Sequence, residues 1–196
     1  MQEIITNRTI FRELELLRLP ISSRQAEFLI DHPRISVSLA HHYAPFLDRY
    51  SVEIRPDRMI DIRDPGGGLA GEAELIEARP GRRVYLIDGY FNVFSVRFNG
   101  RMVLMTVYSE RNGREGVTVD STTSAYIKVD SVLAGVLARL MDLLFPRKVD
   151  ERIVRFLNAA EKIAFAVHAD PAEAYRKLSA SGEMSPEELE NFARIF

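Results

Sequence analysis

Residues 82–129 read RRVYLIDGYFNVFSVRFNGRMVLMTVYSERNGREGVTVDSTTSAYIKV, and this stretch decides the fold. Apolar residues in its last segment favour one parity, since Val119, Ala125 and Ile127 all stand at odd positions. Asp120 and other polar residues stand between them. A period of two is typical of a strand with one buried and one wet face. The stretch therefore predicts an antiparallel sheet that covers a core on one side.

Turn signals recur about every eight to twelve residues from Tyr50 to the end of this stretch, which is typical of a meander. Asn99-Gly100 and Asn112-Gly113 suit two-residue hairpin turns, because both residue types tolerate positive φ. Upstream, the sequence has breaks at Asp64-Pro65-Gly66 and at Arg79-Pro80-Gly81. The strands that these turns predict are 50–55, 58–63, 69–78, 82–91, 93–98, 101–109 and 116–129.

Helices are expected before the strands. Ser22 is followed by Gln25 in the spacing of a capping box, and Pro33 can begin a second helix. Two short helices are therefore predicted over about 22–47. The segment 9–19 is ambiguous, because its apolar residues fit either a helical face or a strand.

After the strands, an apolar stripe at helical spacing runs over 132–167 and predicts a long C-terminal helix. Pro146 either kinks this helix or begins a second one, because a proline inside a helix removes a backbone hydrogen bond. Asp170-Pro171 ends it, and the remaining residues predict an acidic tail of two short helices. We expect one main domain over 1–168 and a helical tail over 169–196.

The composition excludes several classes of function. The chain has 196 residues, of which 46% are hydrophobic and 28% charged, so an ordinary globular domain is expected. It has no Cys, which excludes thiol catalysis, disulfides and zinc sites built on cysteine. A net charge of -2 gives no basic footprint, so no nucleic-acid partner is expected. The N-terminus has no signal-like apolar run, and 132–145 is shorter than a membrane span, so a cytoplasmic protein without a span is expected.

Two stretches carry a resemblance to a known superfamily: LPISS (19–23) leading into AEFLIDHP (26–33), and the terminal helix over 145–164. Together with the order of elements, they resemble the START-related helix-grip superfamily of lipid-transfer domains, polyketide cyclase-like proteins and birch-pollen allergens. The resemblance covers roughly 9–168 and rests on architecture, since the superfamily has no invariant catalytic motif.

The resemblance implies an α+β fold in which a curved antiparallel sheet of six or seven strands wraps around the long C-terminal helix. It favours a strand for 9–19, because the superfamily places a strand before the two short helices. It also implies an elongated apolar cavity between sheet and helix, which relatives use for lipids, sterols, polyketides or plant hormones.

The strand 101–109 supports such a cavity independently. Met102 and Leu104 lie on one face, whereas Val103 and Met105 lie on the other, so both faces need a cover. One cover would be the helix and cavity. The other would be a homodimer interface, a partner, or the acidic tail. The alternative is that these side chains pack solidly and leave no cavity.

Strand parity and the resemblance together suggest candidate ligand-binding residues. Asp88 is a charge in an otherwise apolar strand and needs a partner such as Arg97 or Arg101. That pair would either orient a polar ligand group in the cavity or form a cross-strand ion pair outside it. Candidate tyrosines in these strands would either contact the ligand or pack at the edge of the sheet. The full set of candidates is Tyr85, Asp88, Tyr90, Arg97, Met102, Leu104, Tyr108, Val136, Leu140 and Leu144.

No cofactor or metal is expected. His41 and His42 are adjacent and would point about 100° apart on a helix, so they cannot readily converge with His32 on one ion. The Gly66-Gly67-Gly68 run lacks the remaining residues of a phosphate-binding loop and reads as a turn.

Three functions remain open. The first is binding or transport of a hydrophobic small molecule or lipid. The second is a cyclase, dehydratase or hydrolase, which needs Asp88, Arg97 and tyrosines to converge in the cavity. The third is a filled-core module that dimerises through the outer sheet face.

Overall fold

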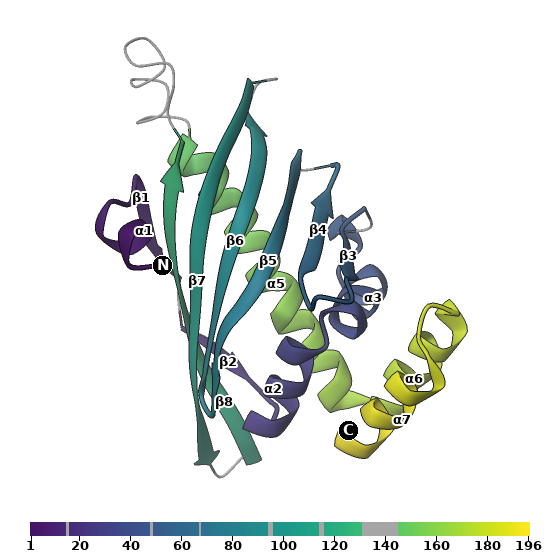
Figure 1. Ribbon diagram of the computed structural model, residues 1–196. Helices are drawn as coiled ribbons and strands as arrows, with labels where there is room; N and C mark the ends of the chain where they lie inside the picture. The colour runs from purple at the N-terminus through teal and green to yellow at the C-terminus, as the bar shows by residue number, and fades with distance from the viewer. Residues whose placement is uncertain (15, 48, 67, 94–95, 114–115, 131–144) are drawn as a thin grey trace.

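The computed structural model describes all residues except 15, 48, 67, 94–95, 114–115 and 131–144. Its centre is an eight-stranded antiparallel sheet with the strand order β1-β8-β7-β6-β5-β4-β3, in which β2 also pairs with β8 (Figure 1). The strands are β1 (Ile10–Glu13), β2 (Leu17–Leu19), β3 (Ser51–Ile54), β4 (Ile60–Asp64), β5 (Leu69–Arg79), β6 (Arg82–Val93), β7 (Val96–Gly113) and β8 (Gly116–Val129).

Helices cover one face of this sheet, which we call the inner face. The helices of the described part of the chain are α1 (Gln2–Thr6), α2 (Ser23–Asp31), α3 (Pro33–Tyr43), the 3-10 helix η1 (Pro45–Leu47), α5 (Phe145–Ala169), α6 (Pro171–Ser181) and α7 (Pro186–Ile195). Of these, α2, α3 and α5 lie over the inner face. Helix α5 crosses behind the sheet in Figure 1, with α2 and α3 beside it; α1 lies on the other side. The predicted α+β class and helix-grip plan are confirmed by this arrangement.

Helix α5 turns a stripe of small and branched residues towards the core. Ala159, Ile163, Ala164 and Val167 recur at helical spacing, and each is at most 5% exposed. Pro146 is the second residue of the described part of α5. The predicted helical stripe over 132–144 lies outside the described residues.

The segment 9–19 forms strands, as the resemblance favoured. It contributes two strands, β1 and β2, whose residues Ile10 and Leu19 pair with Ile127 and Val119 of β8. The sheet therefore has eight strands, more than the six or seven that were predicted.

The predicted hairpin turn at Asn99-Gly100 is wrong, because β7 continues without a break through both residues. Gly100 stands directly opposite Gly89, which in turn stands opposite Gly71. A Cβ on Gly89 would lie 2.4 Å from the carbonyl oxygen of Ala70. This row of glycines is thus needed for the close approach of neighbouring strands, which is a common use of glycine where a sheet bends sharply.

The two predicted short helices are present and begin as expected. Ser22 Oγ accepts a hydrogen bond from the Gln25 backbone amide at 3.3 Å, and the Ser22 amide donates to Gln25 Oε1 at 2.9 Å. This reciprocal capping box starts α2, and Pro33 starts α3.

The tail helices α6 and α7 pack against α2, α3 and α5, away from the outer sheet face (Figure 1). Ala174, Leu178 and Phe192 are at most 1% exposed and belong to the same core cluster as α2 and α5. The Phe192 ring lies 6.2 Å from that of Phe28 on α2. The tail is therefore held by apolar contacts with the helices that flank the sheet.

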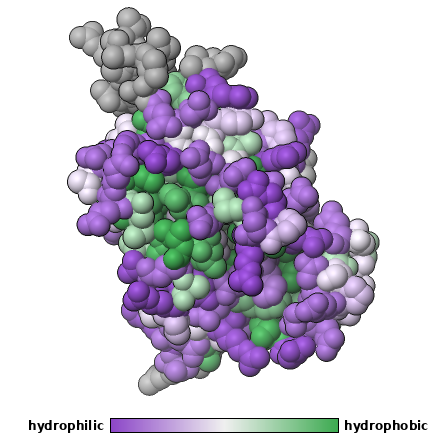
Figure 2. Space-filling view, in the orientation of Figure 1, coloured by the Kyte–Doolittle hydropathy of each residue, from purple (hydrophilic) through white to green (hydrophobic). Residues whose placement is uncertain are grey.

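The outer face is covered in part by α1, which was not expected. Ile4 is 2% exposed and packs against Val84 and Val103 of β6 and β7. Figure 2 shows apolar side chains gathered on this face and bordered by polar ones, and Val107 remains 46% exposed there. Helix α1 of the same chain thus provides part of the second cover that β7 was inferred to need.

Candidate ligand cavity

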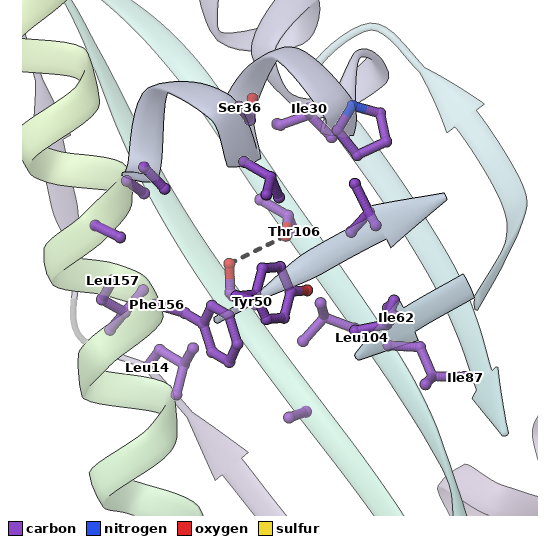
Figure 3. Close-up of a pocket in the computed structure, with 18 of the residues that line it drawn as sticks. Leu14, Ile30, Ser36, Tyr50, Ile62, Ile87, Leu104, Thr106, Phe156 and Leu157 are labelled. Carbon is purple, nitrogen blue, oxygen red and sulfur yellow. Dashed lines mark hydrogen bonds between the residues drawn. The ribbon is translucent and has the colours of Figure 1, made fainter. Parts of the chain in front are cut away.

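A cavity of about 550 Å³ lies between the inner face of the sheet and the helices (Figure 3). Pockets of this size hold drug-sized ligands. Its walls are largely apolar, and they come from the sheet, from α2 and α3, and from α5. The predicted cavity is therefore present between the elements that the resemblance named.

Alternate residues of the central strands form the sheet wall, as the pleat requires. From β7, these are Met102, Leu104, Thr106 and Tyr108. They stand opposite Ile127, Ala125, Thr123 and Ser121 of β8. This wall is thus apolar towards one end and bears hydroxyl groups towards the other.

The helix wall combines large and small side chains. Phe156 of α5 packs edge-to-face on Tyr50, with 5.1 Å between the ring centroids, and Figure 3 shows both at the cavity beside Leu157. Ala160 and Ala164 of the same helix also line the cavity. Because an alanine fills less space than the residues around it, these positions help to leave room between helix and sheet.

A polar network joins α2 to the sheet where the cavity ends at Tyr108. The Tyr108 hydroxyl donates to Glu27 Oε1 at 2.8 Å and accepts from Arg83 Nη1 at 2.9 Å. Arg83 also makes two parallel bonds to Asp31, Nε to Oδ1 at 2.8 Å and Nη2 to Oδ2 at 2.7 Å. The network leaves the Tyr108 ring as the part that faces the cavity.

The electrostatics of this network keep Tyr108 neutral and Arg83 charged. Burial and the hydrogen bond to Glu27 raise the pKa of Tyr108 far above its usual value, so the phenol stays protonated. The hydrogen bond to Asp31 likewise raises the pKa of Arg83. Neither group is arranged to exchange a proton near neutral pH.

The other polar side chains at the cavity are neutral. Thr106 Oγ1 and Thr123 Oγ1 form a hydrogen bond of 3.0 Å across β7 and β8 (Figure 3). Ser36 Oγ donates to the Leu29 carbonyl at 2.6 Å. Burial, with a smaller effect from Asp64, raises the pKa of Tyr50 far above its usual range.

Arg101 borders the cavity, but its parity in β7 places its side chain on the outer face. There it lies near Glu3 of α1, which forms an ion pair with Lys128. The hydrogen bond from Lys128, aided by the charges of Lys128 and Arg101, lowers the pKa of Glu3.

Of the candidate residues, Met102, Leu104 and Tyr108 lie at the cavity. Tyr90 borders it, but, like Arg101, it stands at the outer parity of its strand, opposite Asn99. Tyr85, Asp88 and Arg97 are not part of its lining. Tyr85 Oη instead donates to the Ile30 carbonyl at 3.3 Å, and burial raises the pKa of Tyr85 to about 12. Val136, Leu140 and Leu144 lie outside the described residues.

Asp88 and Arg97 are both exposed and stand apart from the cavity lining. Asp88 is directly opposite Arg101 in the strand register, and both stand at the outer parity of their strands. The Arg97 guanidinium lies 3.8 Å from the Tyr90 ring centroid, which is a cation–π contact.

Sequence reasoning missed several lining residues. Thr106 has the parity of Met102 and Leu104 in β7, and Thr123 has the parity of Ala125 in β8. Parity alone therefore predicts that both threonines line the cavity. They were passed over because they are polar. Ile62 and Leu69, at the far edge of the sheet, carried no comparable signal.

Within the described ranges, no group of three or more His, Asp and Glu side chains is placed to hold a metal ion. His32 Nδ1 contacts the Phe28 carbonyl at 2.8 Å, and His41 Nε2 contacts the Tyr50 carbonyl at 2.7 Å. None of the helices in the described part of the chain has the length and apolarity needed to cross a bilayer.

Comparison with known proteins gives similarity in structure only. No family model matches the chain, and no curated protein matches it either. Among solved structures, it is similar to Ara h 8.0201 at 12% identity, with 80% of this chain and 99% of that one covered and a TM-score of 0.46.

Two further solved structures are similar over most of their length. Norcoclaurine synthase from Thalictrum flavum, in complex with dopamine and hydroxybenzaldehyde, is 12% identical, with 83% of this chain and 91% of that one covered and a TM-score of 0.45. A START superfamily protein from Mycobacterium smegmatis is 10% identical, with 80% and 98% covered and a TM-score of 0.43.

Proposed function

We propose that this protein binds or carries a hydrophobic small molecule or lipid in the cavity between the sheet and α5. The observation that supports this most is the cavity itself, about 550 Å³ in volume and lined mainly by aliphatic and aromatic side chains. An apolar ligand placed there gains the free energy of leaving water, which is proportional to the apolar area it buries.

The enzyme hypothesis is less well supported. It required Asp88, Arg97 and tyrosines to converge inside the cavity, whereas Asp88 and Arg97 are exposed and outside the lining. The Tyr108 hydroxyl, which is close to the cavity, is committed to Glu27 and Arg83. We therefore favour a carrier over a cyclase-like catalyst.

Filling the cavity tests the proposal. Ala160 lines the cavity and is itself exposed, so Ala160→Trp adds a large ring without displacing a packed neighbour. The neutral dye N-phenyl-1-naphthylamine serves as the probe, because it becomes fluorescent in apolar surroundings. We expect the unaltered protein to bind the dye and Ala160→Trp to weaken this binding at least tenfold.

Ala180→Trp is the matched control, because Ala180 is exposed on α6 and is not part of the lining. This variant should bind the dye as the unaltered protein does. Equal dye binding by both tryptophan variants, or none by the unaltered protein, would refute the proposal. Native mass spectrometry of the purified protein adds a second readout, in which a retained apolar adduct is expected.

A further inference from the structure

The polar groups at the cavity indicate what kind of ligand it accepts. Thr106 and Thr123 face each other across β7 and β8, and their hydroxyls share one hydrogen bond of 3.0 Å. Whichever hydroxyl donates, the other keeps its own hydrogen for a third partner, and lone pairs remain on both oxygens. The pair therefore offers a donor and acceptors to a molecule in the cavity.

The remaining hydroxyls differ in what they can offer. Ser36 has committed its hydrogen to the Leu29 carbonyl, and Tyr108 has committed its hydrogen to Glu27. Tyr50 stays a neutral phenol, since burial holds its pKa far above neutral pH. Figure 3 shows Thr106 and Tyr50 at the same cavity, so the cavity has a second neutral polar residue besides the threonine pair.

The charged groups around the cavity disfavour an anion. Arg101 borders the cavity, but its parity places its side chain on the outer face. Behind Tyr108, the single guanidinium of Arg83 is shared by two carboxylates, at 2.7 Å from Asp31 and 3.7 Å from Glu27. This cluster is net negative, and its one cation is already paired. A carboxylate ligand would lose its hydration at the apolar wall without gaining a cation there.

We propose that the Thr106–Thr123 pair recognises a hydroxyl or carbonyl oxygen on an uncharged apolar ligand. This inference rests on the proposed function, since it concerns the ligand of the same cavity. The ligand class it names is a neutral lipid-like alcohol or ketone, as opposed to a fatty acid or a bare hydrocarbon.

The test compares ligands that differ in one end group. Dodecan-1-ol, dodecanoate and dodecane are each titrated against N-phenyl-1-naphthylamine bound to the unaltered protein at pH 7.5, and displacement of the dye gives their affinities. We expect dodecan-1-ol to bind at least tenfold more tightly than dodecanoate. In the double variant Thr106→Val, Thr123→Val, its affinity should fall about three- to tenfold, as expected for one lost hydrogen bond. The affinities of dodecane and of the dye should not change.

Two control variants keep the test sharp. Thr122 precedes Thr123 in β8, and its parity places its side chain on the outer face. Thr122→Val therefore removes a hydroxyl outside the cavity and should leave all affinities unchanged. Thr106→Ser, Thr123→Ser keeps both hydroxyls and should retain the preference for the alcohol, even if the valine pair fails to fold.

Each outcome is decisive. Dodecanoate binding as tightly as dodecan-1-ol would overturn the inference, and so would an alcohol affinity untouched by the valine pair or lost in the serine pair. All three results leave the carrier proposal standing, because the dye still binds. Failure of the unaltered protein to bind the dye overturns the carrier proposal, and the inference falls with it.

Discussion

Arg83 and Asp31 form two parallel hydrogen bonds, of 2.8 and 2.7 Å, that join the sheet to α2. The Arg83 side chain is 7% exposed, whereas that of Asp31 is 35% exposed. Because α2 contributes part of the cavity wall, this pair fixes the wall against β6.

Removing the Asp31 carboxylate leaves the buried Arg83 with Glu27, at 3.7 Å, as its remaining counter-charge. We expect Asp31→Asn to lower the free energy of unfolding by about 2 kcal/mol, less than for a fully buried pair because Asp31 is partly hydrated. Arg83→Lys should be similar, since an ammonium cannot make the two parallel bonds. Chemical denaturation in urea measures both. Arg24→Lys, on α2 but outside this network, should be neutral.

The glycine row makes a second prediction about stability. Gly89→Ala places a methyl group 2.4 Å from the Ala70 carbonyl, so the strands must separate locally, at a cost of about 2–3 kcal/mol. Gly113→Ala is the matched control, because its nearest atom would be at 3.7 Å. Equal stability of the two variants in thermal melts would show that the strands are not in close approach there.

The buried Asp120 makes stability depend on pH. The hydrogen bond from Arg18, at 2.9 Å, and the charge of Arg111 lower its pKa below the ordinary 3.8. A carboxylate with a lowered pKa stabilises the fold above its unfolded pKa and loses this effect as pH falls through its folded pKa. We therefore expect Asp120→Asn to lower the melting temperature at pH 7 and to have a smaller effect at pH 2–3. Calorimetry across this range measures it, and a constant difference would contradict the argument.

The tail helix α7 is expected to stabilise the whole fold. Phe192 is 1% exposed and stacks on Phe196, with ring centroids 4.7 Å apart. Phe192→Ala should lower the free energy of unfolding by about 3–5 kcal/mol, as is typical of a deleted core aromatic ring. Tyr175→Ala, at a position 37% exposed, should cost far less. A single cooperative transition shifted as a whole would confirm that tail and sheet unfold together.

The helix α1 makes the last prediction. Ile4 is 2% exposed and packs against Val84 and Val103. We therefore expect Ile4→Ala to lower the free energy of unfolding by about 2 kcal/mol. This is at the low end for a core isoleucine, because α1 is short. Gln2→Ala, on the exposed side of the same helix, is the control. Unfolding in guanidinium chloride measures the difference in stability between these two variants.

Local signals in the sequence predicted most elements. The capping box at Ser22 and the proline at Pro33 mark helix starts that depend only on neighbouring residues. The alternation of apolar and polar residues along β8 likewise depends only on which face of that one strand is buried. Such features can be read from a short window, because the interactions that cause them are local.

Contacts between distant segments were not predictable in this way. Asn99-Gly100 has the composition of a turn, but Gly100 lies within a strand because Gly89 and Gly71 stand beside it. The cover that Ile4 provides and the polar members of the cavity wall also depend on which strands become neighbours. These choices are made by tertiary packing, which no single window of sequence contains.

The pairing of Ile10 with Ile127 has a consequence for the growing chain. β1 is the first strand of the sheet to be synthesised, whereas its partner β8 is the last, and α5 comes later still. Contacts so far apart in the chain form slowly, because a long loop must close first. Until α5 has been made, the apolar inner face of the sheet lacks that cover, so the synthesis of α5 ends the exposure of this face to aggregation.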